Sequence, residues 1–259
     1  MKIEEIKHIE EEMKKIIPIF IKESGNYIYP QKIFFFNDKT NLSRIIDFGR
    51  GFGAWCKGEN IFFAVQNARV FERLARMPGY GKKTREYIVE PKDFIDNDKD
   101  YLDYMQYIID NGFKEIDYCL DVLPHEIMHL IGSGGGVIGE GVTELRTRQI
   151  CKKYGIRCAP IMHTKETKFV RMLEKFVGSD LLDLTAFTKD NTALFKKCEE
   201  LFGKEFFEIY EDMEIQYTKY IMDYSPDPIE HYKKYREIDF SKMYKFLKEK
   251  EKEKEEVEI

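Results

Sequence analysis

The sequence has few cysteines, and their spacing indicates no disulfide framework. The five cysteines are an odd number, and no pair has the C-x-x-C spacing of a zinc knuckle or redox motif. We therefore expect reduced and mostly buried thiols.

Long apolar runs and an excess of positive charge are also absent. No run approaches the ~20 apolar residues that span a bilayer. The charged N-terminus MKIEEIKHIEEEMKK lacks the apolar segment of a signal peptide. The net charge is −5 and basic residues are interspersed with acidic ones, which argues against a nucleic-acid-binding face. We expect a soluble, cytoplasmic protein that binds neither nucleic acid nor membrane.

The first part of the chain has the pattern of a mixed α and β structure. Apolar residues at helical spacing predict an amphipathic helix over residues 3–22, and a second helix is expected at 68–77. Short aromatic and β-branched runs bounded by Gly, Asn, Asp and Pro predict strands. These runs are residues 32–36, 44–48, 60–65 and 86–89.

From about residue 100 the pattern is helical. Several apolar-periodic segments end at a glycine, which is typical of helix C-termini. The expected helices are 100–111, 117–131, 139–153, 166–177, 180–188, 190–202, 204–223 and 229–250. The sequence thus predicts an α+β fold. A lobe at 1–132 holds a small mixed sheet, a mainly helical lobe spans 133–250, and a charged, solvated or frayed tail spans 251–259.

Midway along the chain lies the stretch LPHEIMHLIGSGGGVIGEGVTELRTR, residues 123–148. His125 and His129 are four residues apart, so on a helix both imidazoles lie on one face and can reach one zinc ion. Glu126 lies between them as a candidate general base. The chain has only five histidines, and two of them form this motif. An alternative is that both histidines are hydrogen-bonded in a core helix.

A catalytic zinc site needs a third protein ligand and keeps one position open for water. The glycine-rich residues 132–136 can fold the chain back, so that a second helix packs against the first. Glu140 and Glu144 lie near the start of that helix and on the same face. On the residues alone, either glutamate could approach the metal.

The HEIMH motif followed by EGVTE resembles the gluzincin class of zinc metallopeptidases. The resemblance covers about 25 residues, with a short separation between His129 and Glu140 that matches compact members of the class. It implies a zincin-like fold in which Glu140 is the third ligand and Glu144 is a partner that orients a zinc-bound histidine. The reverse assignment of the two glutamates is the alternative.

Two other interpretations of the motif are weaker. The string HEIMHLIGSGG matches the start of the metzincin signature, but Gly135 occupies the position of its third histidine. His163 could in principle be a third ligand, yet it follows a separate loop, and a surface or hydrogen-bonded histidine is the more common outcome there.

The resemblance implies peptide-bond hydrolysis of a peptide or protein substrate, whereas the residues alone indicate metal-assisted hydrolysis. Glu126 would move the proton between water and the leaving amine. Enzymes of this class often add a downstream His or Tyr to stabilise the oxyanion. They also often bind substrate along an exposed strand, for which 60–65 and 86–89 are candidates. The oxyanion candidates are Tyr217, Tyr220, Tyr224 and His231.

Two other functions remain open at this point. One is a non-catalytic binding or regulatory protein in which a metal braces the central helices. The other is a protease dedicated to a single protein partner, of the prophage or stress-response type. An intact Glu126 argues against the first, because a purely structural metal site does not need a general base.

Overall fold

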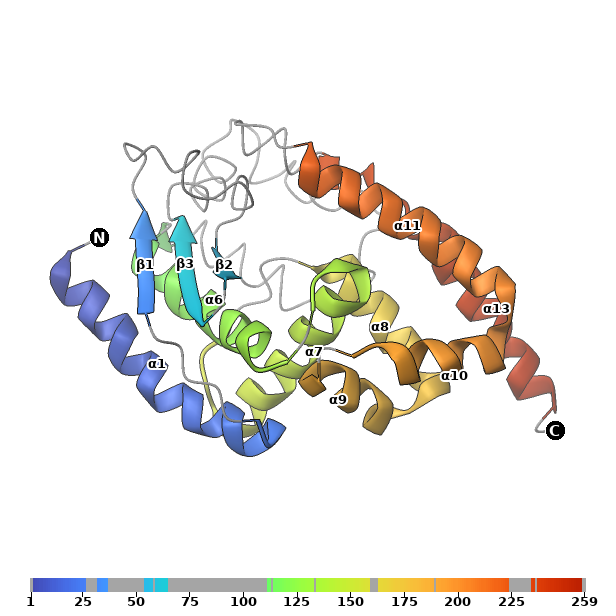
Figure 1. The fold of residues 1–259 in the computed structure, drawn as a ribbon, viewed down its shortest axis with the longest axis horizontal. Coiled ribbons are helices and arrows are strands. Elements are labelled where there is room, and N and C mark those ends of the chain that lie inside the picture. Colours follow the sequence, from blue (N-terminus) through green and yellow to red (C-terminus); the bar gives the residue numbers. More distant parts are fainter. Residues whose placement is uncertain are drawn as a thin grey trace.

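The computed structural model describes residues 2–26, 32–36, 54–57, 59–64, 111–112, 114–132, 134–158, 163–188, 190–223, 234–235 and 237–257. These residues form a mainly helical α+β structure with one small mixed sheet (Figure 1), as the sequence predicts. Some expected elements lie outside the described residues: the strands at 44–48 and 86–89, the helix at 68–77, and nearly all of the helix at 100–111.

The sheet has the strand order β1-β3-β2 in the described residues. Strand β1 (Lys32–Phe36) is parallel to β3 (Asn60–Ala64), and β2 (Ala54–Lys57) is antiparallel to β3. Alternation places Ile61 and Phe63 of β3 in the core, while Phe62 stacks on Phe34 on the other face, with ring centroids 4.9 Å apart. The strands expected at 32–36 and 60–65 are confirmed, whereas β2 was not predicted.

Helix α1 (Ile3–Ser24) packs against α6 (Glu115–Ile131), which carries the HExxH motif. The buried stripe of α1 recurs at helical spacing, because Ile9, Met13, Ile16, Ile17 and Phe20 all face the core. Helix α6 also contacts β2 and β3, so it lies between α1 and the sheet. This position buries most of the motif helix.

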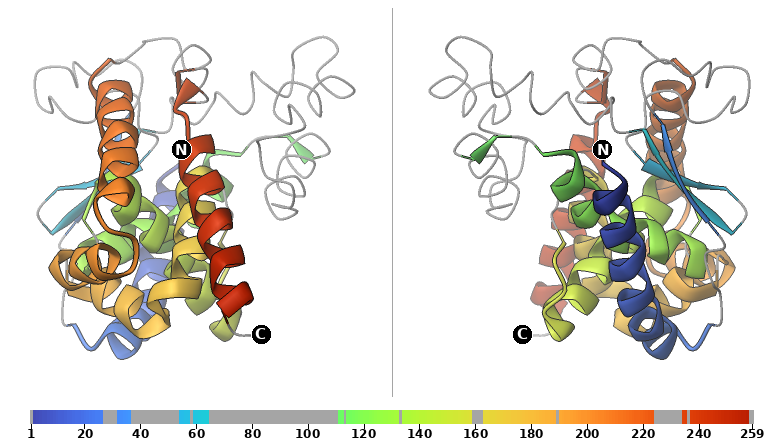
Figure 2. Two further views of the ribbon diagram at one scale, coloured as in Figure 1. Left: turned by 90° about the vertical axis from the view of Figure 1, so that its right-hand side faces the viewer. Right: turned by 90° about the vertical axis from the view of Figure 1, so that its left-hand side faces the viewer.

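Helix α7 (Gly136–Tyr154) begins at the end of the glycine-rich residues 132–136, here called the glycine bridge. It packs against both α6 and α8 (Thr164–Val177). The remaining helices are α9 (Ser179–Thr188), α10 (Thr192–Phe202), α11 (Lys204–Met222) and α13 (Ser241–Val257). Figure 1 shows α1 on one side of the molecule and α11 with α13 on the other, with α6 and α7 between them; in Figure 2, α11 and α13 face the viewer in the left view and α1 does so in the right view. Most of these helices agree with the expected ranges within a few residues.

The final helix differs from the expected range of 229–250. It begins at Ser241 and continues to Val257, so residues 251–257 are helical. Oppositely charged side chains three or four residues apart support this helix, as in the pair of Lys250 and Glu253 at 2.8 Å. Glu251 also pairs with Lys175 of α8 at 2.7 Å, which links the charged end of α13 to α8.

Within the described residues, no helix has the length and apolar character to cross a membrane.

Candidate metal centre

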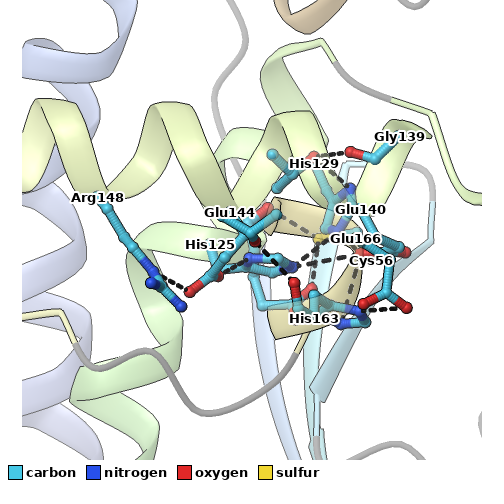
Figure 3. A network of polar contacts seen from close by, with 12 residues as sticks. Cys56, His125, His129, Gly139, Glu140, Glu144, Arg148, His163 and Glu166 are labelled. Carbon is cyan, nitrogen blue, oxygen red and sulfur yellow. Dashed lines mark hydrogen bonds and ion pairs between the residues drawn. The ribbon is translucent and has the colours of Figure 1, made fainter. Parts of the chain in front are cut away.

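Helix α6 places both histidines of the motif on one face, as the spacing predicts (Figure 3). The rings of His125 and His129 are perpendicular, with centroids 4.7 Å apart, and their Nε2 atoms are separated by 3.0 Å. Both side chains are mostly buried, at 9% and 15% exposure. The two nitrogens therefore point at a common position in the interior.

Glu140 comes from the first turns of α7, which the glycine bridge folds back against α6. Its Oε2 atom lies 3.0 Å from Nε2 of His129 and 3.5 Å from Nε2 of His125. Gly139 is required beside it, because a Cβ atom there would lie 2.0 Å from the carbonyl oxygen of Gly134. A glycine at position 139 thus allows the start of α7 to approach the backbone of Gly134 more closely than a residue with a side chain would.

The three atoms fit one metal ion. Ligands arranged tetrahedrally at ~2.0–2.1 Å from zinc are separated from each other by roughly 3.3–3.4 Å. The observed separations of 3.0, 3.0 and 3.5 Å bracket that value, and the three ligand atoms all lie within 4.8 Å of one another. Two imidazoles with one carboxylate are also the ligand set of known catalytic zinc sites.

The electrostatics of the cluster favour a cation. Burial opposes the charged form of His125, but hydrogen bonds to Glu140 and Glu144 raise its pKa overall to about 10. Burial likewise opposes ionisation of Glu140, yet the charges of His129 and His163 hold its pKa well below the usual value. A proton or a metal ion is therefore stabilised at the point where these side chains converge.

Glu144 lies where the resemblance to gluzincins implies, next to a candidate ligand. Its Oε2 atom is 2.8 Å from Nδ1 of His125, and its Oε1 atom accepts a hydrogen bond of 2.7 Å from Nε of Arg148. Burial opposes its charge, but Arg148 and His125 lower its pKa to about 2. An ionised Glu144 accepts a hydrogen bond from Nδ1–H of His125, so Nε2 is the atom that can bind a metal ion once it has given up its own proton.

Thr143 provides a similar contact for the other histidine, which sequence reasoning had not assigned. Its hydroxyl donates to the carbonyl oxygen of Gly139 at 2.8 Å. The same hydroxyl oxygen lies 3.5 Å from Nδ1 of His129, where it can accept the ring proton. Each motif histidine therefore has a neighbour on α7 that favours Nε2 as the ligand atom.

His163 lies beside this cluster, although it is not one of the three candidate ligands. Its ring is parallel to that of His125 at 5.4 Å, and its Nε2 atom lies 3.6 Å from Oε2 of Glu140. It has a φ of 60°, which is uncommon for a non-glycine residue and is found among the described residues only here. A backbone held in this region often marks a functional position.

Behind His163 lies the fully buried Glu166. Nδ1 of His163 is 4.0 Å from Oε1 of Glu166, and neither atom has a hydrogen-bond partner. The other oxygen of Glu166 accepts a hydrogen bond of 2.6 Å from Tyr235. His163 thus resembles His125 in having a carboxylate behind the ring and Nε2 near Glu140, but its carboxylate is too distant for the hydrogen bond that Glu144 makes to His125.

Glu126, the candidate general base, is 4% exposed and contacts β2. The thiol of Cys56 lies 3.3 Å from Oε2 of Glu126 and 3.0 Å from its backbone oxygen. Strand β2 is an outer strand of the described sheet, and it also packs against the motif helix. Strand β3, the predicted candidate for substrate pairing, is central and bonded on both edges, which leaves no edge for an added strand.

The expected oxyanion residues are only partly within the described structure. Tyr217 and Tyr220 of α11 are both buried. Burial and the negative charges of Glu140 and Glu166 raise the pKa of Tyr217 well above its usual value, so its hydroxyl stays neutral. Tyr224 and His231 lie outside the described residues.

Comparisons of the chain with protein-family models, with curated proteins and with solved structures found no match.

Proposed function

We propose that the protein is a zinc-dependent metallopeptidase of gluzincin type with a zincin-like fold. The observation that carries the proposal is the convergence of Nε2 of His125, Nε2 of His129 and Oε2 of Glu140 within 3.0 to 3.5 Å of one another. These three residues would hold the metal. When bound, zinc would supply Lewis acidity, which polarises a carbonyl group and makes a water molecule more acidic.

The residues around the metal would divide the remaining tasks. Glu126 would take a proton from the attacking water and return it to the leaving amine. Glu144 and Thr143 would keep the ligand histidines in the required tautomer. His163, with Nε2 facing the cluster, would hydrogen-bond the oxygen of the substrate carbonyl as it gains negative charge.

The substrate would be a peptide or protein segment in extended conformation. Such a segment can add to an outer strand through main-chain hydrogen bonds. Strand β2 meets this requirement, because it is an outer strand in the described sheet and its Cys56 side chain contacts Glu126. A peptide lying along β2 would pass next to the general base.

The test compares hydrolysis of a peptide library by the wild type and by Glu126→Gln, with the metal content of both proteins measured in parallel. Glu126→Gln should keep the metal, because Glu126 is not a ligand, and should lose hydrolysis by a factor of about 10²–10⁴. Retention of full activity by a metal-loaded Glu126→Gln variant would contradict the proposed mechanism. Wild-type protein that binds metal but cleaves no member of the library would favour a non-catalytic protein braced by the metal or a protease with a single substrate. A partner protein would then be needed as substrate.

A further inference from the structure

The helix that carries Glu140 begins in a sequence poorly suited to start a helix. Its N-cap residue is Gly135, which offers no side chain to the free N–H groups, and its first turn has no acidic residue. Three of its first six residues are glycines, at 136, 139 and 141. Glycine is about 1 kcal/mol less favourable than alanine in a helix, so this turn is intrinsically weak.

A carboxylate from another helix supplies the missing cap. Oε1 of Glu214, on α11, accepts a hydrogen bond of 3.0 Å from the backbone N–H of Val137. The hydroxyl of Tyr210 donates to the same oxygen at 2.7 Å and orients it. A negative charge at this end of a helix is also stabilised by the helix dipole.

Gly136 makes room for this contact. It has a φ of 84°, and a Cβ atom there would lie 2.6 Å from Oε1 of Glu214. The glycine is therefore required both by its backbone conformation and by the approach of the carboxylate. The bridge and α11 fit each other at this point.

We propose that Glu214 is a positioning residue for the metal centre. By capping the first turn of α7 it holds Glu140, which follows directly after that turn, in place for the metal. The statement about the metal rests on the proposed function, whereas the capping of the turn does not. In this way α11, at the far side of the molecule from α1, stabilises the geometry of the site.

The experiment compares four variants with the wild-type protein. Glu214→Ala removes the cap, and Glu214→Gln keeps an acceptor oxygen without the charge. Glu211→Ala is the matched control, because Glu211 is an exposed acidic residue one turn earlier on the same helix. The fourth variant combines Glu214→Ala with Gly135→Ser. Position 135 has ordinary N-cap dihedral angles and open space around its missing Cβ, so a serine can cap the helix locally.

Two readouts are needed, amide hydrogen exchange of residues 137–141 in metal-free protein and Co²⁺ affinity followed by absorption. Glu214→Ala should accelerate exchange in this turn and weaken Co²⁺ binding about 5- to 30-fold, which corresponds to about 1–2 kcal/mol. Glu214→Gln should show a smaller loss, and Glu211→Ala none. The added serine should recover most of both losses.

A cap that acts only on global stability would give a different pattern. Exchange would then accelerate evenly through the protein, and Gly135→Ser would recover neither readout, which would overturn the proposal. Equal behaviour of Glu214→Ala and Glu211→Ala would also overturn it. If wild-type protein binds no Co²⁺, the proposed metal site fails, while exchange in residues 137–141 still decides whether Glu214 caps the helix.

Discussion

Replacement of Gly141 by alanine tests the packing of α7 against α8 next to the site. In an isolated helix this change stabilises by about 1 kcal/mol. In this structure the added Cβ would lie 2.6 Å from the carbonyl oxygen of Glu166 and 2.7 Å from a methyl group of Val170. Ordinary contacts begin at 3.4 Å, so the helices would have to separate by about 0.8 Å. Overpacking of this kind costs about 1–3 kcal/mol or more.

Because the clashing oxygen of Glu166 is a backbone atom, the cost lies in the upper part of this range, about 2–3 kcal/mol. After subtraction of the gain in helix propensity, Gly141→Ala should destabilise the protein by about 1–2 kcal/mol. For a chain of this size this loss corresponds to a Tm lower by about 2–8 °C, measured by circular dichroism during heating. Gly134→Ala is the control, since nothing lies within 4 Å of a Cβ atom there, and it should change stability by less than about 0.5 kcal/mol. A Gly141→Ala variant as stable as the wild type, or more stable, would refute the close packing of the two helices.

Three further predictions concern the site and its support. Glu144→Gln should weaken zinc binding about 10- to 100-fold in a calorimetric titration, because His125 loses its charged partner; unchanged affinity would contradict that role. Zinc at 100 times its Kd should stabilise the wild type by about 2.7 kcal/mol in thermal unfolding, and this gain should vanish in Glu140→Ala. Gly132→Ala should prevent normal folding, since its Cβ would lie 2.0 Å from the carbonyl oxygen of Ala186; a soluble variant with wild-type Tm would contradict the close contact of α6 and α9.

The sequence predicts well those features that depend on local periodicity. The i, i+4 spacing places His125 and His129 on one face of a helix, and the structure confirms this geometry. The glycine bridge and the resemblance to gluzincins also predict that Glu140 lies beside the two histidines and that Glu144 contacts one of them. The structure has both contacts. In these cases the relevant residues lie within 20 positions of one another, so local rules are sufficient.

Features that depend on distant segments were not predictable in the same way. His163 reaches the cluster only because α8 packs along α7, and no periodicity in its own segment indicates this. The cap from Glu214 joins residues 77 positions apart, and an acidic residue on an amphipathic helix usually faces solvent. Strand β2 is four residues long and gains its hydrogen bonds from β3, so its own sequence carries little strand signal.

The zinc site is most directly tested by the metal content of the purified protein. It is measured by mass spectrometry for the wild type, Glu140→Ala and Glu144→Ala. We expect one zinc ion per chain in the wild type, loss of most of the zinc in Glu140→Ala, and partial retention in Glu144→Ala. Metal-free wild type prepared without chelators would contradict the site as a whole. Loss of most of the zinc in Glu144→Ala, with full retention of zinc in Glu140→Ala, would reverse the assignment of the third ligand.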